Sequence, residues 1–323
     1  MSPKKEFILI FVFSFLIVFI LYFSLYSEKP QKISIKEVVS ELKKEEPPQD
    51  PIQLFFVGDI MLDRTIRKDG ELYGYNKLFS CLEKDLSGYD RVIGNLEGTI
   101  TNFVSVSRDA SYESPESFRF TFDIKAVEAL KDLGLTTVSL GNNHIKDFGN
   151  EGIQQTISNI NELEINYFGD PRKESVKYFI DTIHDTKIAF IPYNHFFGTQ
   201  EQVFEDLKTT QDISDIQIIF AHWGDEYTPA LSDIKILAHQ FADAGADLII
   251  GAHPHVIQEK EVYKNVPIYY SLGNFIFDQY WEESVRTGLG VQVEIKNKKI
   301  KILGEKKFES TRHKGTCAKA PTS

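Results

Sequence analysis

Residues 247–255 read DLIIGAHPH, an apolar run followed by two histidines, His253 and His255, on either side of one proline. A short apolar run of this kind is typical of a buried β-strand. Proline stiffens the backbone, and alternate residues of an extended segment point the same way. We therefore expect His253 and His255 to face one site at the end of a strand.

Four other apolar segments also end on a side chain that can bind a metal. They are QLFFVGD, ending at Asp59; RVIGNLE, ending at Glu97; TVSLGNNH, ending at Asn143 and His144; and IQIIFAH, ending at His222. In an α/β sheet the carboxyl ends of the strands line one crevice, where ligands bind. Mixed oxygen and nitrogen donors suit borderline transition metals. The pattern predicts a site for one or two divalent ions, Mn, Fe or Zn.

Each of these residues alone also has a structural explanation. Asp59 is a favoured residue for a helix N-cap, and Glu97 could be a solvated loop carboxylate. A lone histidine such as His222 is more often a satisfied core residue. The five coordinated strand endings together favour the metal site. Asp147 follows His144 by three residues, one helical turn, so it is placed to orient that imidazole.

Strand and helix patterns alternate from residue 52 to residue 308, without an internal linker. Continuous apolar strands between helices indicate an α/β fold in which helices cover the sheet. The segment 288–308 alternates around a turn at Lys296–Lys299 and predicts an antiparallel hairpin. The polar loop 99–119 is either functional or a mobile surface loop. Residues 309–323 are expected to be a disordered tail.

The N-terminal region predicts a membrane anchor. Residues 7–26 hold 20 uncharged residues rich in Phe, Ile and Leu, the length of a transmembrane helix, after a short flank at 1–6. The charged stretch 27–51 reads as a tether. Lysines flank both sides of the apolar segment, so the positive-inside rule gives no orientation.

The formal charge of −11 excludes general nucleic-acid binding, which needs a basic surface. The two cysteines, Cys81 and Cys317, form no CxxC or spaced zinc pattern, so no disulfide framework is readable. Cys81 is expected to pack as a small apolar residue. Cys317 is expected to be a free thiol in the polar tail.

Six blocks of the chain resemble the signature blocks of the capsule synthesis CapA family, the poly-γ-glutamate branch of the calcineurin-like metallophosphoesterases. The blocks occur in consistent order between residues 54 and 278: FVGDIMLDR, GNLEGTIT, SLGNNHIKDFG, AHWGDEYTP, DAGADLIIGAHPHVIQ and YYSLGNFIFD. The resemblance implies an α/β/β/α sandwich of two stacked sheets flanked by helices. It also implies a single-pass membrane protein whose C-terminal domain lies outside the cell.

The resemblance assigns roles to single residues. Asp59 and His255 match first-site metal ligands, and Glu97 takes the position of a metal-bridging Asp. Asn143, His222 and His253 match second-site ligands. His144 matches the proton donor, which Asp147 would hold.

The chain departs from the wider superfamily at one ligand. The superfamily opens with Asp-x-His, but Met61 stands at that histidine position, as CapA-like proteins generally have it. Methionine is a weak ligand for hard cations, so the first metal site is one donor short unless Asp63 or water fills it.

Two functions are compatible with this sequence. One is a metal-dependent hydrolase or transferase, phosphoesterase-like, that acts in capsule or envelope polymer synthesis. The other is a non-catalytic subunit that guides an anionic polymer within a membrane synthesis complex. Candidate contacts to anionic substrate groups are Arg64, Arg108 and Arg119, although surface charge or structural ion pairs explain these arginines equally well.

Overall fold

The computed structural model describes residues 50–111 and 113–319. The predicted transmembrane helix at 7–26 and residues 27–49 of the tether lie outside the described residues. Within the described part of the chain, no helix is long and apolar enough to cross a membrane.

The first sheet has eight strands and is built around β1 (Ile52–Ile60). On one side of β1 the strands run parallel to it, in the order β2 (Arg91–Leu96), β5 (Leu135–Ser139) and β6 (Asn166–Phe168). On the other side lie the antiparallel strands β14 (Thr287–Lys296), β15 (Lys299–Thr311) and β16 (Gly315–Ala318). The short strand β13 (Asn274–Ile276) pairs with the end of β1.

The second sheet has six strands in the order β11-β12-β10-β9-β8-β7. Four of them are mutually parallel: β8 (Thr186–Asn194), β9 (Ile216–His222), β10 (Leu248–Ala252) and β12 (Val266–Tyr269). The edges are the antiparallel strands β7 (Phe179–Ile183) and β11 (Lys260–Tyr263). Every residue of β9 and β10 is buried, which explains their continuous apolar sequences.

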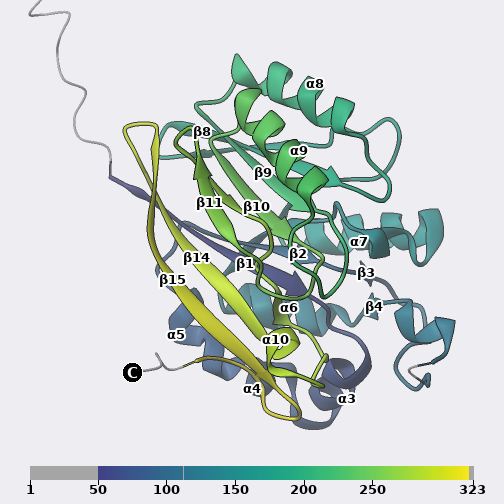
Figure 1. The fold of residues 1–323 in the computed structure, drawn as a ribbon. Helices are drawn as coiled ribbons and strands as arrows, with labels where there is room; N and C mark the ends of the chain where they lie inside the picture. The colour runs from purple at the N-terminus through teal and green to yellow at the C-terminus, as the bar shows by residue number, and fades with distance from the viewer. Residues whose placement is uncertain (1–49, 112, 320–323) are drawn as a thin grey trace, which may run out of the picture. The chain divides into compact units, whose positions relative to one another are not determined.

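The two sheets stack face to face, and helices cover their outer faces (Figure 1). Between the sheets the ring of Phe56 lies 6.5 Å from that of Phe220. The first sheet is covered by α4 (Tyr75–Phe79), α6 (Ile124–Asp132) and α7 (Gly149–Glu162). The second is covered by α8 (Gln200–Gln211) and α9 (Ser232–Asp243). The expected α/β/β/α sandwich is therefore the observed arrangement.

Other elements connect these layers. The helical ones are α3 (Arg64–Tyr73), α5 (Glu83–Leu86), α10 (Glu283–Arg286), η1 (Ser80–Leu82), η2 (Pro115–Phe118) and η3 (Asn143–Lys146). The segment 99–119 starts with β3 (Thr99–Ile100), which pairs with β4 (Thr121–Phe122). The Ser105 hydroxyl in this segment donates to Asp63 at 2.6 Å, so the loop contacts the start of α3.

The C-terminal region corrects two expectations. The hairpin around Lys296 and Lys299 is confirmed as β14–β15. A disordered tail from residue 309 is wrong, because β15 continues to Thr311 and β16 pairs with it. The domain therefore extends at least to Ala318.

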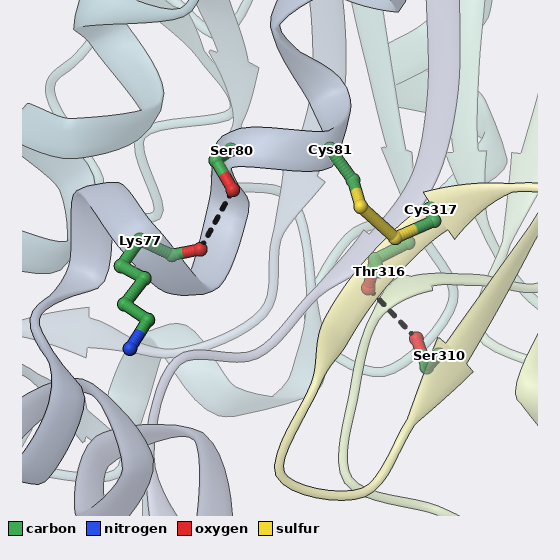
Figure 2. Close-up of a disulfide and its surroundings, with 6 residues drawn as sticks. All are labelled: Lys77, Ser80, Cys81, Ser310, Thr316 and Cys317. Atoms are coloured by element: carbon green, nitrogen blue, oxygen red, sulfur yellow. Dashed lines mark hydrogen bonds between the residues drawn. A yellow bond between two sulfur atoms is a disulfide. The ribbon is translucent and has the colours of Figure 1, made fainter.

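Cys81 and Cys317 form a disulfide, so the expectation of a buried apolar cysteine and a free thiol is wrong. Figure 2 shows the bond joining η1 to β16, next to the hydrogen bond between Ser310 and Thr316. The two cysteines are 236 residues apart, and only the pairing of the C-terminal strands brings them together. No local sequence spacing marks such a pair.

Candidate metal centre

The structure brings all six predicted ligands to one edge of the sandwich, where strands of both sheets end. The acceptor and donor atoms of Asp59, Glu97 and His222 lie within 4.8 Å of one another, and so do those of Glu97, His253 and His255. The sixth residue, Asn143, places its side-chain oxygen 2.8 Å from Nε2 of His222. Glu97 belongs to both groups and therefore occupies the middle of the cluster.

Asp59 is fixed at the end of β1 by close backbone packing. A Cβ on the preceding Gly58 would lie 1.8 Å from the carbonyl oxygen of Gly273, so only glycine fits there. This approach lets the Asp59 backbone N–H donate to that carbonyl at 3.0 Å. The Asp59 carboxylate then accepts the His253 backbone N–H at 3.2 Å and lies 3.3 Å from Nδ1 of His255.

His253 and His255 reach the cluster through an unusual backbone. An extended conformation was expected, but their φ angles are 96° and 58°, in the left-handed region that few non-glycine residues adopt. Such strained residues persist where the surrounding structure holds them, and they concentrate at functional sites. The rings lie 5.8 Å apart, so both face the cluster although the expected conformation is wrong.

Asn95 and Asn142 are central to the cluster, and sequence reasoning missed both. The Asn95 amide donates to Asp59 at 2.8 Å and lies 3.1 Å from Nδ1 of His222. Its oxygen accepts from the Asn142 amide at 3.1 Å. A signal existed for Asn95, because it lies on β2 two residues before Glu97, which directly follows the strand, and so points to the same face. Both asparagines order the carboxylates and imidazoles around them.

Two buried polar atoms of the cluster lack a hydrogen-bond partner among the described residues: Oε1 of Glu97 and Nδ1 of His253. Burial, followed by the nearby Asp59 charge, raises the pKa of Glu97 well above its usual value. Burial and then His255 lower the pKa of His253 to about 3, and burial and His253 lower the pKa of His222. His253 and His222 are thus neutral at pH 7, as metal ligation requires. Clustered carboxylate and imidazole donors with orphaned atoms fit a divalent transition metal.

Met61 and Asp63 contribute no donor to this cluster. Met61 is fully buried in the core beneath α3, and its sulfur accepts the Asp63 backbone N–H at 3.1 Å. The Asp63 carboxylate caps α3 by accepting the Arg64 N–H and also accepts the Thr121 N–H at 2.9 Å. With Asp63 committed to these bonds, it does not fill the gap left by Met61.

His144 lies beside the cluster and is held by Asp147. Its Nδ1 is 2.9 Å from Oδ2 of Asp147, and its Nε2 is 3.9 Å from Oε1 of Glu97. Asn142 caps this short helix by accepting the His144 backbone N–H at 3.1 Å. The arrangement presents Nε2 toward the cluster, where the imidazole can hand a proton to a leaving group.

The three candidate arginines have different surroundings. Arg64 forms an ion pair with Asp278 at 2.5 Å. Arg108 is exposed and pairs with Glu71 at 2.8 Å. Arg119 donates to the carbonyl oxygen of Asp147 at 3.1 Å, which makes it part of the support for His144. The structure brings none of them into the metal cluster itself.

Comparisons with known proteins agree with this geometry. Residues 53–279 match the family described as bacterial capsule synthesis protein PGA_cap. The chain is 29% identical over 289 residues to the capsule biosynthesis protein CapA of Bacillus anthracis, a match that covers 83% of this chain and 69% of the relative. It is also 29% identical to the PGA biosynthesis protein CapA of Bacillus subtilis (strain 168), over 81% of this chain and 71% of the relative.

Among solved structures, a hypothetical protein from Thermus thermophilus aligns with a TM-score of 0.52 at 14% identity. The alignment covers 80% of this chain and 99% of that one, which shows a shared fold and nothing more. The family match covers most of the chain and confirms the CapA resemblance. This chain therefore belongs to the PGA_cap family of bacterial capsule synthesis proteins.

Proposed function

We propose that this protein is a metal-dependent hydrolase or transferase, anchored in the membrane by residues 7–26, that acts outside the cell on an anionic polymer of the capsule or envelope. The observation that carries the proposal is the buried cluster around Glu97, whose Oε1 has no hydrogen-bond partner among the described residues and lies 3.7 Å from Nε2 of His255. A buried carboxylate without a partner is costly unless a cation pairs with it. Asp59, Glu97, Asn143, His222, His253 and His255 would hold that metal.

The chemistry divides between the metal and His144. A bound divalent metal lowers the pKa of water and polarises a phosphoryl or carbonyl oxygen. His144, oriented through Nδ1 by Asp147, directs Nε2 at the substrate and donates a proton to the leaving group. The bond cleaved is a phosphoester or, as the second choice, an amide.

The disulfide supports an extracytoplasmic location. Disulfides persist in oxidising compartments and are rare in the cytosol, where thiols are kept reduced. The bond between Cys81 and Cys317 joins η1 to the last strand of the first sheet. A domain that carries this bond suits an oxidising, extracytoplasmic compartment.

One observation favours a second function, the binding and guiding of an anionic polymer without catalysis. Met61 stands at the position of the metal-binding histidine of the wider superfamily, and its sulfur accepts the backbone N–H of Asp63 rather than facing the cluster. A site short of one ligand could hold metal for structure or for polymer binding only. Capsule synthesis complexes that assemble in the membrane would then use this protein as a positioning subunit.

Turnover by the purified full-length chain separates the two functions. The chain is assayed on an aryl phosphodiester and on γ-glutamyl amides, with and without added manganese, alongside elemental analysis. Manganese-dependent turnover that disappears in His144→Ala establishes the hydrolase. Bound metal with no turnover, together with polymer binding, supports the guiding function. A chain that takes up no metal after supplementation refutes both metal-dependent versions.

A further inference from the structure

A second feature lies beside the metal centre, on the opposite side of an aromatic wall. It is a cleft of about 510 Å³ lined by four cationic side chains and a single carboxylate. We call it the cation cleft; its charged residues are Arg64, Lys68, Arg108, Arg312 and Asp278. The whole chain carries more acidic than basic residues, 47 against 36, so a lining of four cations and one carboxylate is unusual for it; Asp109 and Glu71 pair with two of the cations from the rim.

The cation cleft touches the metal centre through Phe120. The guanidinium carbon of Arg64 lies 5.0 Å from the centre of the Phe120 ring, and that ring lies 4.3 Å from the ring of His144. Tyr227 also contacts both sites. Its ring lies 6.0 Å from the ring of His255 and 5.7 Å from that of Trp281, which lines the cation cleft.

The cations differ in how firmly they are already paired. Lys68 and Arg108 form exposed ion pairs with Asp109, at 3.1 Å and 2.7 Å, which contribute little and can exchange for a ligand carboxylate. Nε of Arg64 is buried without a partner among the described residues. Arg312 is exposed and makes no ion pair with any residue that the structure describes.

Arg312 belongs to the segment 309–323, which the sequence predicted to be a disordered tail. It lies in the turn between β15 and β16. The disulfide of Cys317 joins β16 to η1, and His313, next to Arg312, places Nδ1 2.8 Å from Oδ1 of the buried Asp69 in α3. Two independent links thus fix the turn beside α3, which supplies Arg64 and Lys68.

We propose that the cation cleft binds successive carboxylates of an acidic polypeptide whose reacting end lies at the metal centre. Arginine forks match carboxylates in geometry, and spaced cations along a cleft suit a repeating anion. The placement of the reacting end rests on the proposed function; the binding of the polypeptide does not.

The test is the affinity of the full-length chain, purified in detergent, for fluorescently labelled poly-γ-glutamate, measured by anisotropy at two salt concentrations. Arg312→Gln and Lys68→Gln should each weaken binding about two- to five-fold, the range of an exposed ion pair, and should reduce its dependence on salt. Arg312→Lys should retain most of the affinity. Lys208→Gln, an equal charge change on α8 over the other sheet, should bind like the parent.

Three outcomes decide the matter, with thermal unfolding used to show that every variant is folded. Parent-like affinity in both Arg312→Gln and Lys68→Gln overturns the cleft. Tighter binding of an oligophosphate than of poly-γ-glutamate, lost in the same variants, overturns the assignment to carboxylates. His253→Ala should lose metal and still bind the polymer. Absence of metal in the parent would refute the proposed function. Polymer binding that depends on the cation cleft would still support this inference.

Discussion

Nδ1 of His144 lies 2.9 Å from Oδ2 of Asp147, and the same carboxylate oxygen accepts the backbone N–H of Phe120 at 2.7 Å. The carboxylate is thereby held between the imidazole and the backbone that leads into β4, so the imidazole has one preferred orientation. Arg119 adds a bond to the Asp147 carbonyl at 3.1 Å. The support of His144 is built from residues that do not themselves enter the metal cluster.

His144→Ala should abolish turnover while the metal content stays close to that of the parent. The reason is that loss of general-acid help costs about 10²–10⁴ in rate, whereas the ligands around Glu97 remain. Asp147→Asn should cost less, because it weakens only the orientation and charge support of the imidazole. His239→Ala, on the exposed face of α9, is the matched control. Equal turnover by parent and His144→Ala would remove His144 from the mechanism.

His253→Ala should remove most of the bound metal, since it deletes a buried donor beside Glu97. Added manganese or zinc should raise the melting temperature of the parent. At a metal concentration one hundred times Kd, the free energy of unfolding should increase by about 2.7 kcal/mol. The variant should gain little. Elemental analysis and thermal unfolding with and without chelator measure both effects. A variant that keeps its full metal content contradicts the ligand role.

Asp206→Asn should stabilise the protein near neutral pH. Asp206 lies in α8 with one carboxylate oxygen buried and unpartnered among the described residues, and burial raises its pKa to about 6. A folded-state pKa above the unfolded value of 3.8 means that the ionised folded form is disfavoured. Stability is therefore lost as pH rises from about 4 to 6 and stays lower above that range.

Asparagine removes this cost, so the gain should be about 1–3 kcal/mol at pH 7.5 and should vanish at pH 4. Urea unfolding at both pH values measures it. Asp212→Asn, an exposed change at the end of the same helix, should show no comparable gain. A pH-independent effect of Asp206→Asn would refute burial as its cause.

Cys317→Ser should lower the free energy of unfolding by about 2–5 kcal/mol, the usual cost of losing a native disulfide. Thiol titration of the denatured, unreduced parent should find no free cysteine, since the chain's two cysteines are paired. Cys81→Ser should behave like Cys317→Ser, because either change breaks the same bond. Two reactive thiols in protein isolated from an oxidising compartment would contradict the pairing.

The sequence alone predicted the metal ligands, because their positions follow from local patterns. Apolar strands ending in Asp59, Glu97, His222 and His253 predicted one cluster, because parallel strands share an edge. The sequence did not predict contacts between residues that are far apart in the chain. The link between Cys81 and Cys317 and the pairing of β16 depend on strand order, which no spacing encodes. The left-handed backbone at His253 likewise reflects packing around Asp59 rather than any local preference.

The position of β1 in the middle of its sheet constrains when the protein can fold. β1 begins the described domain, yet its partners β13 and β14 lie more than 200 residues later. Such distant pairings close large loops and slow folding. Until β14 is available, β1 has an open hydrogen-bonding edge, and until residue 253 is available Asp59 lacks the His253 N–H that holds it. The first sheet can therefore be completed only after nearly the whole described domain is available.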